Sequence, residues 1–567
     1  MDSQPTAEEA ALRREIVKMF QIHAFELKKE AVKLCVKLFL EHDKDTRKKW
    51  TNKMIELLKK QTLQSSLISE ELIRETFRQC KSKGSQDAGK LLNVFDAFSL
   101  QPYDFEPELG KMVLRVIFDF KLQIFDVVVE PFKKKKAVPK SDFYRDFDYK
   151  LQTTNYIISR KATPTLAADS SSFSHAARQR FLLVKQRAAR CASLKNFKFT
   201  TCEILSASTK TLKSVVVLGM LTQQKADCYH IEDLSGSIEV EFKEDTKFHH
   251  ALFHEHSIAI FEGNFENSVL KVNEVAMVPV ESAETTRKEL SSNENWFGGE
   301  DKIAFRCSER LRSALAKQED TSIIFLSDVF LDDMKTMRAL NKLLMGYKDQ
   351  PPIAIVLCGN FCSRPRQTDT IDLLDRGFRY LANQLQQMKK EYEKTQFIFV
   401  PGPDDPFVDS VLPRPHLPSL LFKHVSPIIS ATFASNPCRI QFASQEIVVF
   451  RNDLIKKMCR HSINSITVES IPSRYARSIL SQAHLCPLPQ HITPILADFS
   501  HCLSLHPLPD LLISADRFET FQEKVVGTET IVSNPGSFAR SNYTFHVYYP
   551  AQNRIEASQI PNSELID

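Results

Sequence analysis

The apolar positions near the N-terminus follow the period of an α-helix. Within residues 11–60 they recur at spacings of three and four, at Ala24, Leu27, Ala31, Leu34 and Leu38. This spacing lines them along one helical face. The same segment carries fourteen Lys or Arg and seven Asp or Glu, a net charge of plus seven. We therefore predict a basic helical module over residues 1–98.

A further helix is predicted after Ser69, which precedes an acidic first turn as N-cap residues do. Residues 99–185 are mixed in character and are predicted to form a connector with some helix. The run Lys133–Lys136 lies between prolines. Such runs are typical of solvated linkers, and a nuclear-import signal is the alternative.

Residues 186–285 change to short β-branched runs separated by Gly, Asn and Asp turn signals. The runs are "SVVVLGMLT", "CYHIEDLSGSIEVEF", "SIAIFEGNF" and "VLKVNEVAMVPV", with "LSG" as a hairpin turn. About five strands fit a small closed barrel such as the OB-fold.

The charge of this barrel argues against a nucleic-acid groove. Residues 211–280 hold eleven Asp or Glu and five Lys or Arg, a net charge of minus six. Because that charge would repel a phosphate backbone, we predict a barrel that packs against protein rather than a single-strand binding protein. Weak, salt-sensitive DNA contact through the N-terminal module stays open.

Residues 286–567 alternate between strand and helix patterns. The strands are "SIIFL", "IAIVLCG", "QFIFVPG" and "LLISAD", and the helices carry apolar stripes at Met334, Met337, Leu340 and Leu344, and at Leu374, Phe378, Leu381, Leu385 and Met388. This repetition predicts a sheet covered by helices, with function at the carboxyl ends of its strands. The residues at those ends are Asp328, Gly359, Asn360, Gly402, Pro403, Asp404, Asp405 and Asp516.

These strand ends resemble the motifs of calcineurin-like metallophosphoesterases, which run D-x-H, G-D, G-N-H-D/E, a lone histidine and G-H-x-H. Two divalent metals held by histidines and carboxylates activate a hydroxide in such sites. Carried onto this sequence, the resemblance leaves the ligand set degenerate: Asp328 is kept, but Phe330, Asn360, Pro403, Asp404, Ser514 and Asp516 replace ligands, and His484 is the one surviving candidate. It therefore implies no catalytic residue, no bound metal and no cofactor.

An inactive phosphoesterase preceded by an OB-fold resembles the B subunits of the replicative DNA polymerases, most closely those of DNA polymerase epsilon. The stretches that carry the likeness are "HIEDLSGSIEVEF", "WFGG", "FLSDVFLDD", "LCGNF", "FVPGPDDP", "LPRP", "NPCRIQF", "LSQAHLCPLP", "PDLLISAD" and "NPGSFARSNYTF". The helical N-terminus is similar to the small AAA+ lid-like module of that family.

The resemblance implies a multidomain α+β protein of four parts: the helical module, the connector, the OB-fold and, over residues 286–567, a calcineurin-like domain. It implies a nuclear, non-catalytic accessory subunit that scaffolds the cysteine-rich C-terminal region of the catalytic subunit. The N-terminal module would contact replicative helicase components (GINS), and small histone-fold subunits would complete the complex. A B subunit of another replicative polymerase and a divergent active phosphodiesterase are the alternatives.

Composition excludes several other classes of protein. The chain has 567 residues, 43% apolar and 26% charged, with a net charge of plus five, which is typical of a globular protein of several domains. The acidic N-terminus lacks the features of a signal peptide, and no apolar run approaches the length of a membrane span, so we expect an intracellular protein without membrane contact. Twelve cysteines without a C-x-x-C pair predict buried thiols.

Two histidine-bearing segments could in principle hold metal. His250 and His254, within the cluster His249–His256, are four residues apart, but no third ligand follows at a suitable spacing, so a solvated turn is the simpler interpretation. Loop residues are likewise the simpler interpretation of a second group, because its proline-broken spacing matches no zinc motif: Cys486, His491, His501, Cys502 and His506.

Overall fold

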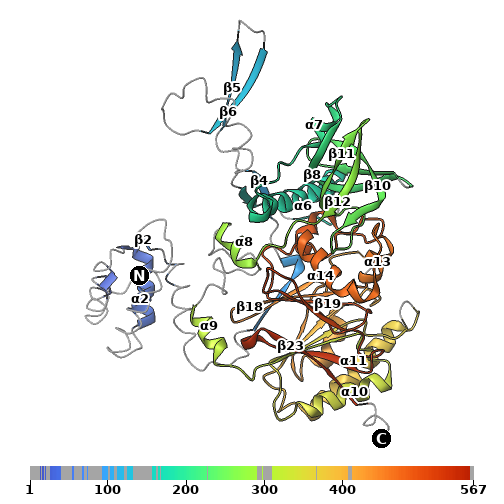
Figure 1. Ribbon diagram of the computed structural model, residues 1–567. Coiled ribbons are helices and arrows are strands. Elements are labelled where there is room, and N and C mark those ends of the chain that lie inside the picture. The colour runs from blue at the N-terminus through green and yellow to red at the C-terminus, as the bar shows by residue number, and fades with distance from the viewer. Residues whose placement is uncertain are drawn as a thin grey trace. The chain divides into compact units, whose positions relative to one another are not determined.

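The computed structural model describes most of the chain from residue 164 onward and shorter stretches before it (Figure 1). It covers residues 164–561 except 167, 227, 290–296, 298–308, 365–366 and 407–410, and residues 13, 16–17, 19–20, 26–39, 51, 54–55, 67–68, 70, 73, 92–99, 103–107, 112–119, 124–131 and 156–160. Ser69 and Lys133–Lys136 lie outside the described residues. The chain divides into two compact units, residues 1–90 and 91–567.

The described residues of the first unit form a small apolar core that includes helix α2 (Lys29–Phe39). This helix accompanies a short parallel pair, β1 (Glu26–Leu27) and β2 (Leu67–Ile68). The buried side chains are Ile16, Phe20, Ala31, Leu34, Cys35, Met54, Ile55, Ile68 and Ile73. The predicted helix is thus confirmed over α2, where Ala31 and Leu34 face the core, whereas Leu27 of the predicted stripe lies in β1.

One strand within the predicted N-terminal module belongs to the second unit. Strand β3 (Leu92–Asp96) pairs antiparallel with β17 (Cys438–Phe442). Just after it, the amide of Ala97 donates to Ser435 Oγ at 2.6 Å. The predicted boundary at residue 98 therefore falls after a strand of the C-terminal sheet; the short pattern "LNVFD" does not reveal so distant a partner.

The predicted connector contains strands as well as a helix. β4 (Tyr103–Pro107) pairs with β7 (Tyr156–Arg160), and β5 (Met112–Asp119) pairs with β6 (Ile124–Pro131), both antiparallel. Helix α6 (Ser170–Arg190) follows and buries Phe181, Val184 and Ala188 against the barrel. The expectation of some helix is confirmed, and the strand pairs were not predicted.

The predicted five-stranded barrel is confirmed. Its strands close in the order β10-β12-β11-β8-β9, with β10 and β12 parallel and the other pairs antiparallel. The bounds are β8 (Leu212–Lys225), β9 (Cys228–Glu232), β10 (Ser237–Phe248), β11 (Ile258–Glu266) and β12 (Val269–Ala276). The turn at "LSG" joins β9 to β10, where Asp233 accepts from the amides of Ser235 and Gly236.

The C-terminal region builds two six-stranded sheets with helices against them (Figure 1). The first has the order β16-β15-β14-β13-β22-β23, and the second β20-β21-β19-β18-β17-β3. The bounds of their strands are β13 (Ile323–Ser327), β14 (Ala354–Cys358), β15 (Gln396–Val400), β16 (Ser430–Phe433), β18 (Gln445–Arg451), β19 (Leu511–Ala515), β20 (Phe521–Lys524), β21 (Ile531–Asn534), β22 (Thr544–Tyr549) and β23 (Arg554–Gln559). The predicted strands are confirmed as β13, β14, β15 and β19.

Amphipathic helices cover these sheets as the sequence predicts. α10 (Met334–Gly346), α11 (Thr370–Gln387) and α12 (Ser419–Val425) share a core with the first sheet, and α13 (Ile455–Arg460) and α14 (Ile471–Gln482) share one with the second. Asp333 caps α10, because its side chain accepts from the amides of Lys335 and Thr336. Among the described residues, no helix is both long and apolar enough to cross a bilayer.

The first histidine-bearing segment is a loop, as expected, and His249 and His250 are exposed, but its middle is not solvated. The second is a loop only in part, because His501 and Cys502 lie in the 3₁₀ helix Ala497–Leu503. In the first segment, Ala251 to His254 are buried, because the loop packs on α14 and on the segment before it. Leu252 N donates to Ser478 Oγ of α14 at 2.8 Å, and Phe253 N donates to Asn464 Oδ1, between α13 and α14, at 3.1 Å. Burial lowers the pKa of His254 to about 4. In the part of the chain that the structure describes, no three His, Cys, Asp or Glu side chains are grouped to hold a metal ion.

Candidate functional site

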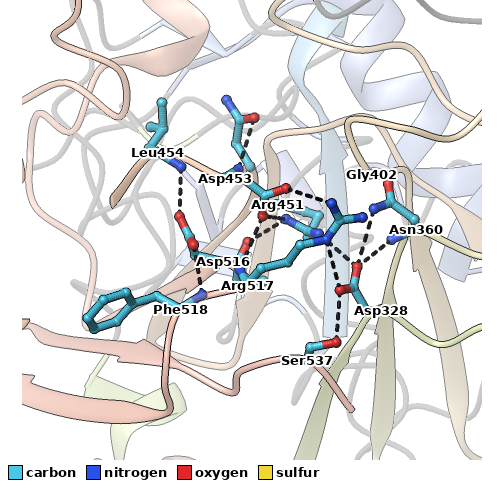
Figure 2. A network of polar contacts seen from close by, with 12 residues as sticks. Asp328, Asn360, Gly402, Arg451, Asp453, Leu454, Asp516, Arg517, Phe518 and Ser537 are labelled. Atoms are coloured by element: carbon cyan, nitrogen blue, oxygen red, sulfur yellow. Dashed lines mark hydrogen bonds and ion pairs between the residues drawn. The ribbon is translucent and has the colours of Figure 1, made fainter. Parts of the chain in front are cut away.

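The strand ends singled out by the sequence meet around one buried carboxylate, Asp328, directly after β13 (Figure 2). Its Oδ1 accepts from the backbone amide and side-chain amide of Asn360 at 3.1 and 3.3 Å, and from Arg451 Nη2 at 2.7 Å. Its Oδ2 accepts from Arg517 Nε at 3.2 Å and Ser537 Oγ at 2.9 Å. The side chain is fully buried.

Arg451 connects the two sheets through this carboxylate. It is the last residue of β18 in the second sheet, and its Nε donates to the carbonyl of Gly359, which follows β14 of the first sheet, at 2.5 Å. Its Nη1 donates to Asp453 Oδ1 at 2.7 Å and to the carbonyl of Ala515 at 3.2 Å. The guanidinium is fully buried, so its charge is balanced by these carboxylates and carbonyls rather than by water.

Arg517 closes the network on its more open side. Besides Asp328, its guanidinium contacts Asp404 Oδ2 at 2.9 Å and Asp453 Oδ2 at 3.6 Å. About a quarter of its side chain is exposed (28%). Figure 2 shows the guanidinium groups of Arg451 and Arg517 lying together against Asp328. Two guanidinium groups therefore lie among the carboxylates at this sheet edge.

The electrostatics of Asp328 favour a permanent charge. Burial alone would raise the pKa of its carboxyl, but Arg451 and Arg517 hold that pKa below its ordinary value. Five donors occupy its two oxygens, and a carboxylate offers about four lone-pair sites. Asp328 thus has no lone pair left for a metal ion or for a proton in transfer.

Of the residues at the first three motif positions, two join the hydrogen-bond network around Asp328 and two do not. Asn360 and Asp404 join the network, since Asp404 N donates to Asn360 Oδ1 at 2.8 Å and Asn360 Nδ2 donates to Asp404 Oδ2 at 3.4 Å. Phe330 is buried, with the Arg540 guanidinium 5.5 Å from its ring centroid. Pro403 is half-buried in the turn that carries Asp404.

The positions of the last two motifs have structural partners. Ser514 hydrogen-bonds Tyr475 at 2.6 Å. Asp516 accepts from the amides of Leu454 and Ile455 at 2.7 and 3.0 Å, at the start of α13. His484 is buried and hydrogen-bonds Cys486 N and Ser500 rather than joining the carboxylates around Arg517. The structure thus brings Asp328, Asn360 and Asp404 together and places His484 among other partners.

Asp405 holds the loops at the strand ends through hydrogen bonds, and its titration should make the stability of the protein depend on pH. Its carboxyl accepts from Phe361 N and Gly402 N, each at 2.7 Å. A Cβ added at Gly359 would lie 2.0 Å from Asp405 Oδ2, so only glycine fits beside it. Burial raises the pKa of Asp405 to about 6.

Because this pKa lies above the value of about 3.9 in an unfolded chain, the folded protein binds a proton more tightly between those values, and stability falls as pH rises through them. We expect the difference in unfolding free energy between wild type and Asp405→Asn to grow in favour of wild type by about 1 kcal/mol from pH 7 to pH 5. Urea unfolding at both pH values measures it. A difference that stays constant, or shrinks, would contradict this assignment.

Sequence reasoning missed three residues of the site: Arg451 and Arg517, whose charges neutralise its carboxylates, and Ser537, which donates to Asp328 Oδ2. A signal was available for the first two. Arg451 ends the apolar run "EIVVFR", and Arg517 directly follows the strand-end Asp516. Both arginines lie at the ends of strands that finish at the same edge as Asp328, a carboxylate for which the sequence offered no partner, so an ion pair could have been predicted.

Comparison with known proteins gives the family. The model of the B subunits of DNA polymerases alpha and epsilon matches residues 323–523. The model of "DNA polymerases epsilon N terminal" matches residues 8–80, and the model of the "DNA polymerase epsilon subunit 2-like, OB-fold domain" matches residues 170–279. The "Probable DNA polymerase epsilon subunit 2" of Caenorhabditis elegans is 81% identical over 99% of this chain and 97% of its own length. The chain belongs to the DNA polymerase epsilon subunit 2 family.

More distant members of this family support the same assignment. "DNA polymerase epsilon subunit 2" of Homo sapiens is 29% identical over 97% of this chain and 98% of its own length. The protein of the same name in Drosophila melanogaster is also 29% identical over 97% of this chain and 98% of its own length. The match over residues 323–523 contains Asp328, Arg451 and Arg517, and the OB-fold match begins with helix α6 rather than at the predicted residue 186.

Proposed function

We propose that this protein is the non-catalytic accessory subunit of DNA polymerase epsilon in chromosomal DNA replication. The observation that carries the proposal is the alignment of almost the whole chain with relatives named as subunit 2 of that polymerase. A B subunit of another replicative polymerase is disfavoured by the epsilon-specific matches over residues 8–80 and 170–279.

We further propose that the C-terminal domain, residues 286–567, is a calcineurin-like phosphoesterase fold without activity. Two observations support this. Both carboxylate oxygens of Asp328 accept hydrogen bonds from within the protein, and Arg451 and Arg517 supply the positive charge among the carboxylates. A metal ion bound at this position would have to displace a buried guanidinium and leave its charge without a partner.

This leads to a direct prediction about catalysis. Purified protein with Mn²⁺ or Mg²⁺ should hydrolyse an aryl phosphodiester at the rate of buffer alone, because no carboxylate oxygen of Asp328 is free to hold a metal ion. Asp328→Ala should leave this baseline unchanged. Metal-dependent turnover that disappears with Asp328→Ala would favour the divergent phosphodiesterase instead.

The barrel and the C-terminal domain form one scaffold in this proposal. Helix α6 and the barrel are fixed to α14: Arg187 Nη1 donates to the carbonyl of Leu480 at 3.0 Å, and the side-chain amide of Gln482 bonds both the amide and the carbonyl of Ile258, at 3.0 and 2.8 Å. We propose that this continuous surface binds the cysteine-rich C-terminal region of the catalytic subunit.

The other proposed roles follow from the family. The N-terminal module, an AAA+ lid-like fold with a net charge of plus seven over residues 11–60, would contact replicative helicase components such as GINS and make at most weak contact with DNA. The small histone-fold subunits would be further members of the complex. The protein would act in the nucleus, and residues 99–185 would connect the module to the scaffold.

Co-expression tests the scaffold directly. An obligate interface between subunits usually buries more than about 2,000 Å² and is more apolar than ordinary surface. We expect this protein to be poorly soluble alone and to gain thermal stability when expressed with the catalytic subunit's C-terminal region, since binding to the folded state stabilises it. A well-behaved monomer whose melting temperature does not change with that region would contradict the proposal.

A further inference from the structure

Helix α6 and the segment that follows it are rich in cations and contain no acidic residue. Residues 170–202 hold seven Lys or Arg and no Asp or Glu. At the average of the chain, 70 acidic residues in 567, a stretch of this length would hold about four. The acid-free stretch 410–445 is longer, but it has only three cations, of which Arg414 and Arg439 are buried. Residues 170–202 differ from that stretch in combining many cations with no acids.

Three of the seven cations are engaged inside the protein, and four face solvent. Arg180 and Arg187 donate to backbone carbonyls, and Arg190 forms an ion pair on the packed side of α6. The exposed cations are Arg178, Lys185, Lys195 and Lys198.

The exposed cations follow one side of α6 and continue into the next segment. Arg178 and Lys185 are two helical turns apart, so they lie on the same face of α6, about 10 Å from each other. The segment after the helix packs back against it, because Leu194 and Phe199 contact the apolar cluster that includes the buried face of α6. This packing keeps residues 195–198 beside the C-terminal half of the helix.

An exposed aromatic ring lies between two of these cations. Residues 195–198 read "KNFK", and all four are exposed, with Phe197 at 43%. The backbone here is fixed, because Phe197 N donates to the carbonyl of Leu194 at 3.1 Å and Phe199 forms a β-bridge with Val216 of β8. The ring and its flanking lysines are therefore held at the surface.

The neighbouring elements leave this positive charge largely in place. Glu281 pairs with Arg190 on the packed side of α6, and Glu262 of β11 accepts from Ser214 Oγ at 3.2 Å. The barrel surface under α6 is apolar rather than acidic, and it is formed by Val216, Leu218, Ile258 and Ile260. The negative charge counted over the barrel therefore does not lie between α6 and its support.

We propose that α6 and residues 191–199 form a binding surface for single-stranded DNA. Bases and phosphates alternate along a single strand, and the stretch "KNFK" likewise places a flat ring between cations. A base would stack on Phe197 while Lys185, Lys195 and Lys198 neutralise neighbouring phosphates. A duplex keeps its bases stacked inside, and an acidic peptide would use the lysines without needing the ring. The choice of DNA rests on the proposed function, because the side chains themselves require only a nucleic-acid single strand.

Replacing Phe197 tests the stacking. Binding of a fluorescent oligothymidylate to the full-length protein is followed by anisotropy. Phe197→Ala should weaken the affinity by about tenfold, as loss of one stacked base does. The matched control is Phe173→Ala, since Phe173 lies on α6, is 45% exposed and is flanked by serines rather than lysines. The control should bind like wild type. Equal affinities of the two variants would overturn the inference.

The dependence on salt tests the phosphate contacts. For single strands, the slope of log K against log salt concentration is about −0.7 for each neutralised phosphate. Lys185→Gln, Lys195→Gln and Lys198→Gln together should therefore make the slope shallower by about 2. The control neutralises three exposed cations elsewhere, Lys335, Arg338 and Lys390, and should leave the slope unchanged.

The basic N-terminal module is the same in both triple variants, so its own contribution to the slope cancels. Melting temperatures equal to that of wild type show that both variants are folded. A slope that changes equally in the two variants, or in neither, would overturn the inference.

Photo-crosslinking locates the contact on the chain. An oligothymidylate carrying 5-iododeoxyuridine is irradiated with the full-length protein, and we expect a crosslinked peptide that contains Phe197. Crosslinks confined to residues 1–98 would overturn the inference. Tighter binding of a polyglutamate peptide than of DNA with equal net charge would also overturn it and favour a protein partner. Because these assays use this protein alone, a negative result that leaves subunit association intact would reject this inference and not the proposed function.

Discussion

Replacing Arg451 by Met should lower the free energy of unfolding by about 3–5 kcal/mol, the usual effect of breaking a buried ion pair from one side. The substitution keeps most of the side-chain volume but leaves Asp328 buried with one cation fewer. It also removes the donors to Gly359 O and Ala515 O, which connect the two sheets. Urea unfolding of the full-length protein, followed by fluorescence, measures the change.

Arg554 provides the matched control. It pairs with Glu556 on β23, and its side chain is half exposed (50%). Exposed ion pairs contribute little, about 0–1 kcal/mol, so Arg554→Met should change stability by no more than that. If the two variants lose similar amounts, the Arg451 network does not hold the sheets together as its geometry indicates.

Much of the fold could be predicted because its elements are locally encoded. Parallel strands covered on both faces, such as β13 and β14, are continuous apolar runs. Helix α11 shows its buried face through the spacing of Leu374, Phe378 and Leu381. The barrel could be predicted because Gly, Asn and Asp turn signals separate its short β-branched strands in the sequence. Strand β3 could not be placed in this way, because its partner β17 is encoded hundreds of residues later and five residues of alternating pattern do not specify a partner.

The sequence predicted where the site lies, at the ends of the strands, but not which side chains contact one another there. Because Asp328, Asn360 and Asp404 follow predicted strands, the sequence placed them at one edge of the sheet, and in the structure they are hydrogen-bonded to one another. The side chains that neutralise them come from the second sheet, and only tertiary packing places Arg451 and Arg517 against the first. His484 shows the opposite case: its residue type suited a metal site, but its position after α14 gives it the partners Cys486 and Ser500.

Deleting residues 1–90 should abolish association with the replicative helicase while leaving binding to the catalytic subunit nearly intact. The cut falls between the two compact units, so it removes the basic module and keeps β3 in its sheet. The module's charge of plus seven over residues 11–60 suggests an acidic partner face, so the helicase contact of the full-length protein should weaken as salt rises. Co-immunoprecipitation from replicating cells at two salt concentrations measures both partners.

A slightly longer deletion, of residues 1–99, is the control that the structure supplies. It also removes β3, the hydrogen bond from Ala97 N to Ser435 Oγ and the contact of the Phe98 and Phe499 rings. We expect it to lower the melting temperature by roughly 5–10 °C relative to the shorter deletion and to weaken association with the catalytic subunit, because the edge of β17 is then uncovered. Helicase proteins recovered equally with the 1–90 deletion and with full-length protein would assign the basic module another role, whereas equal melting temperatures of the two deletions would contradict the placement of β3 in the C-terminal sheet.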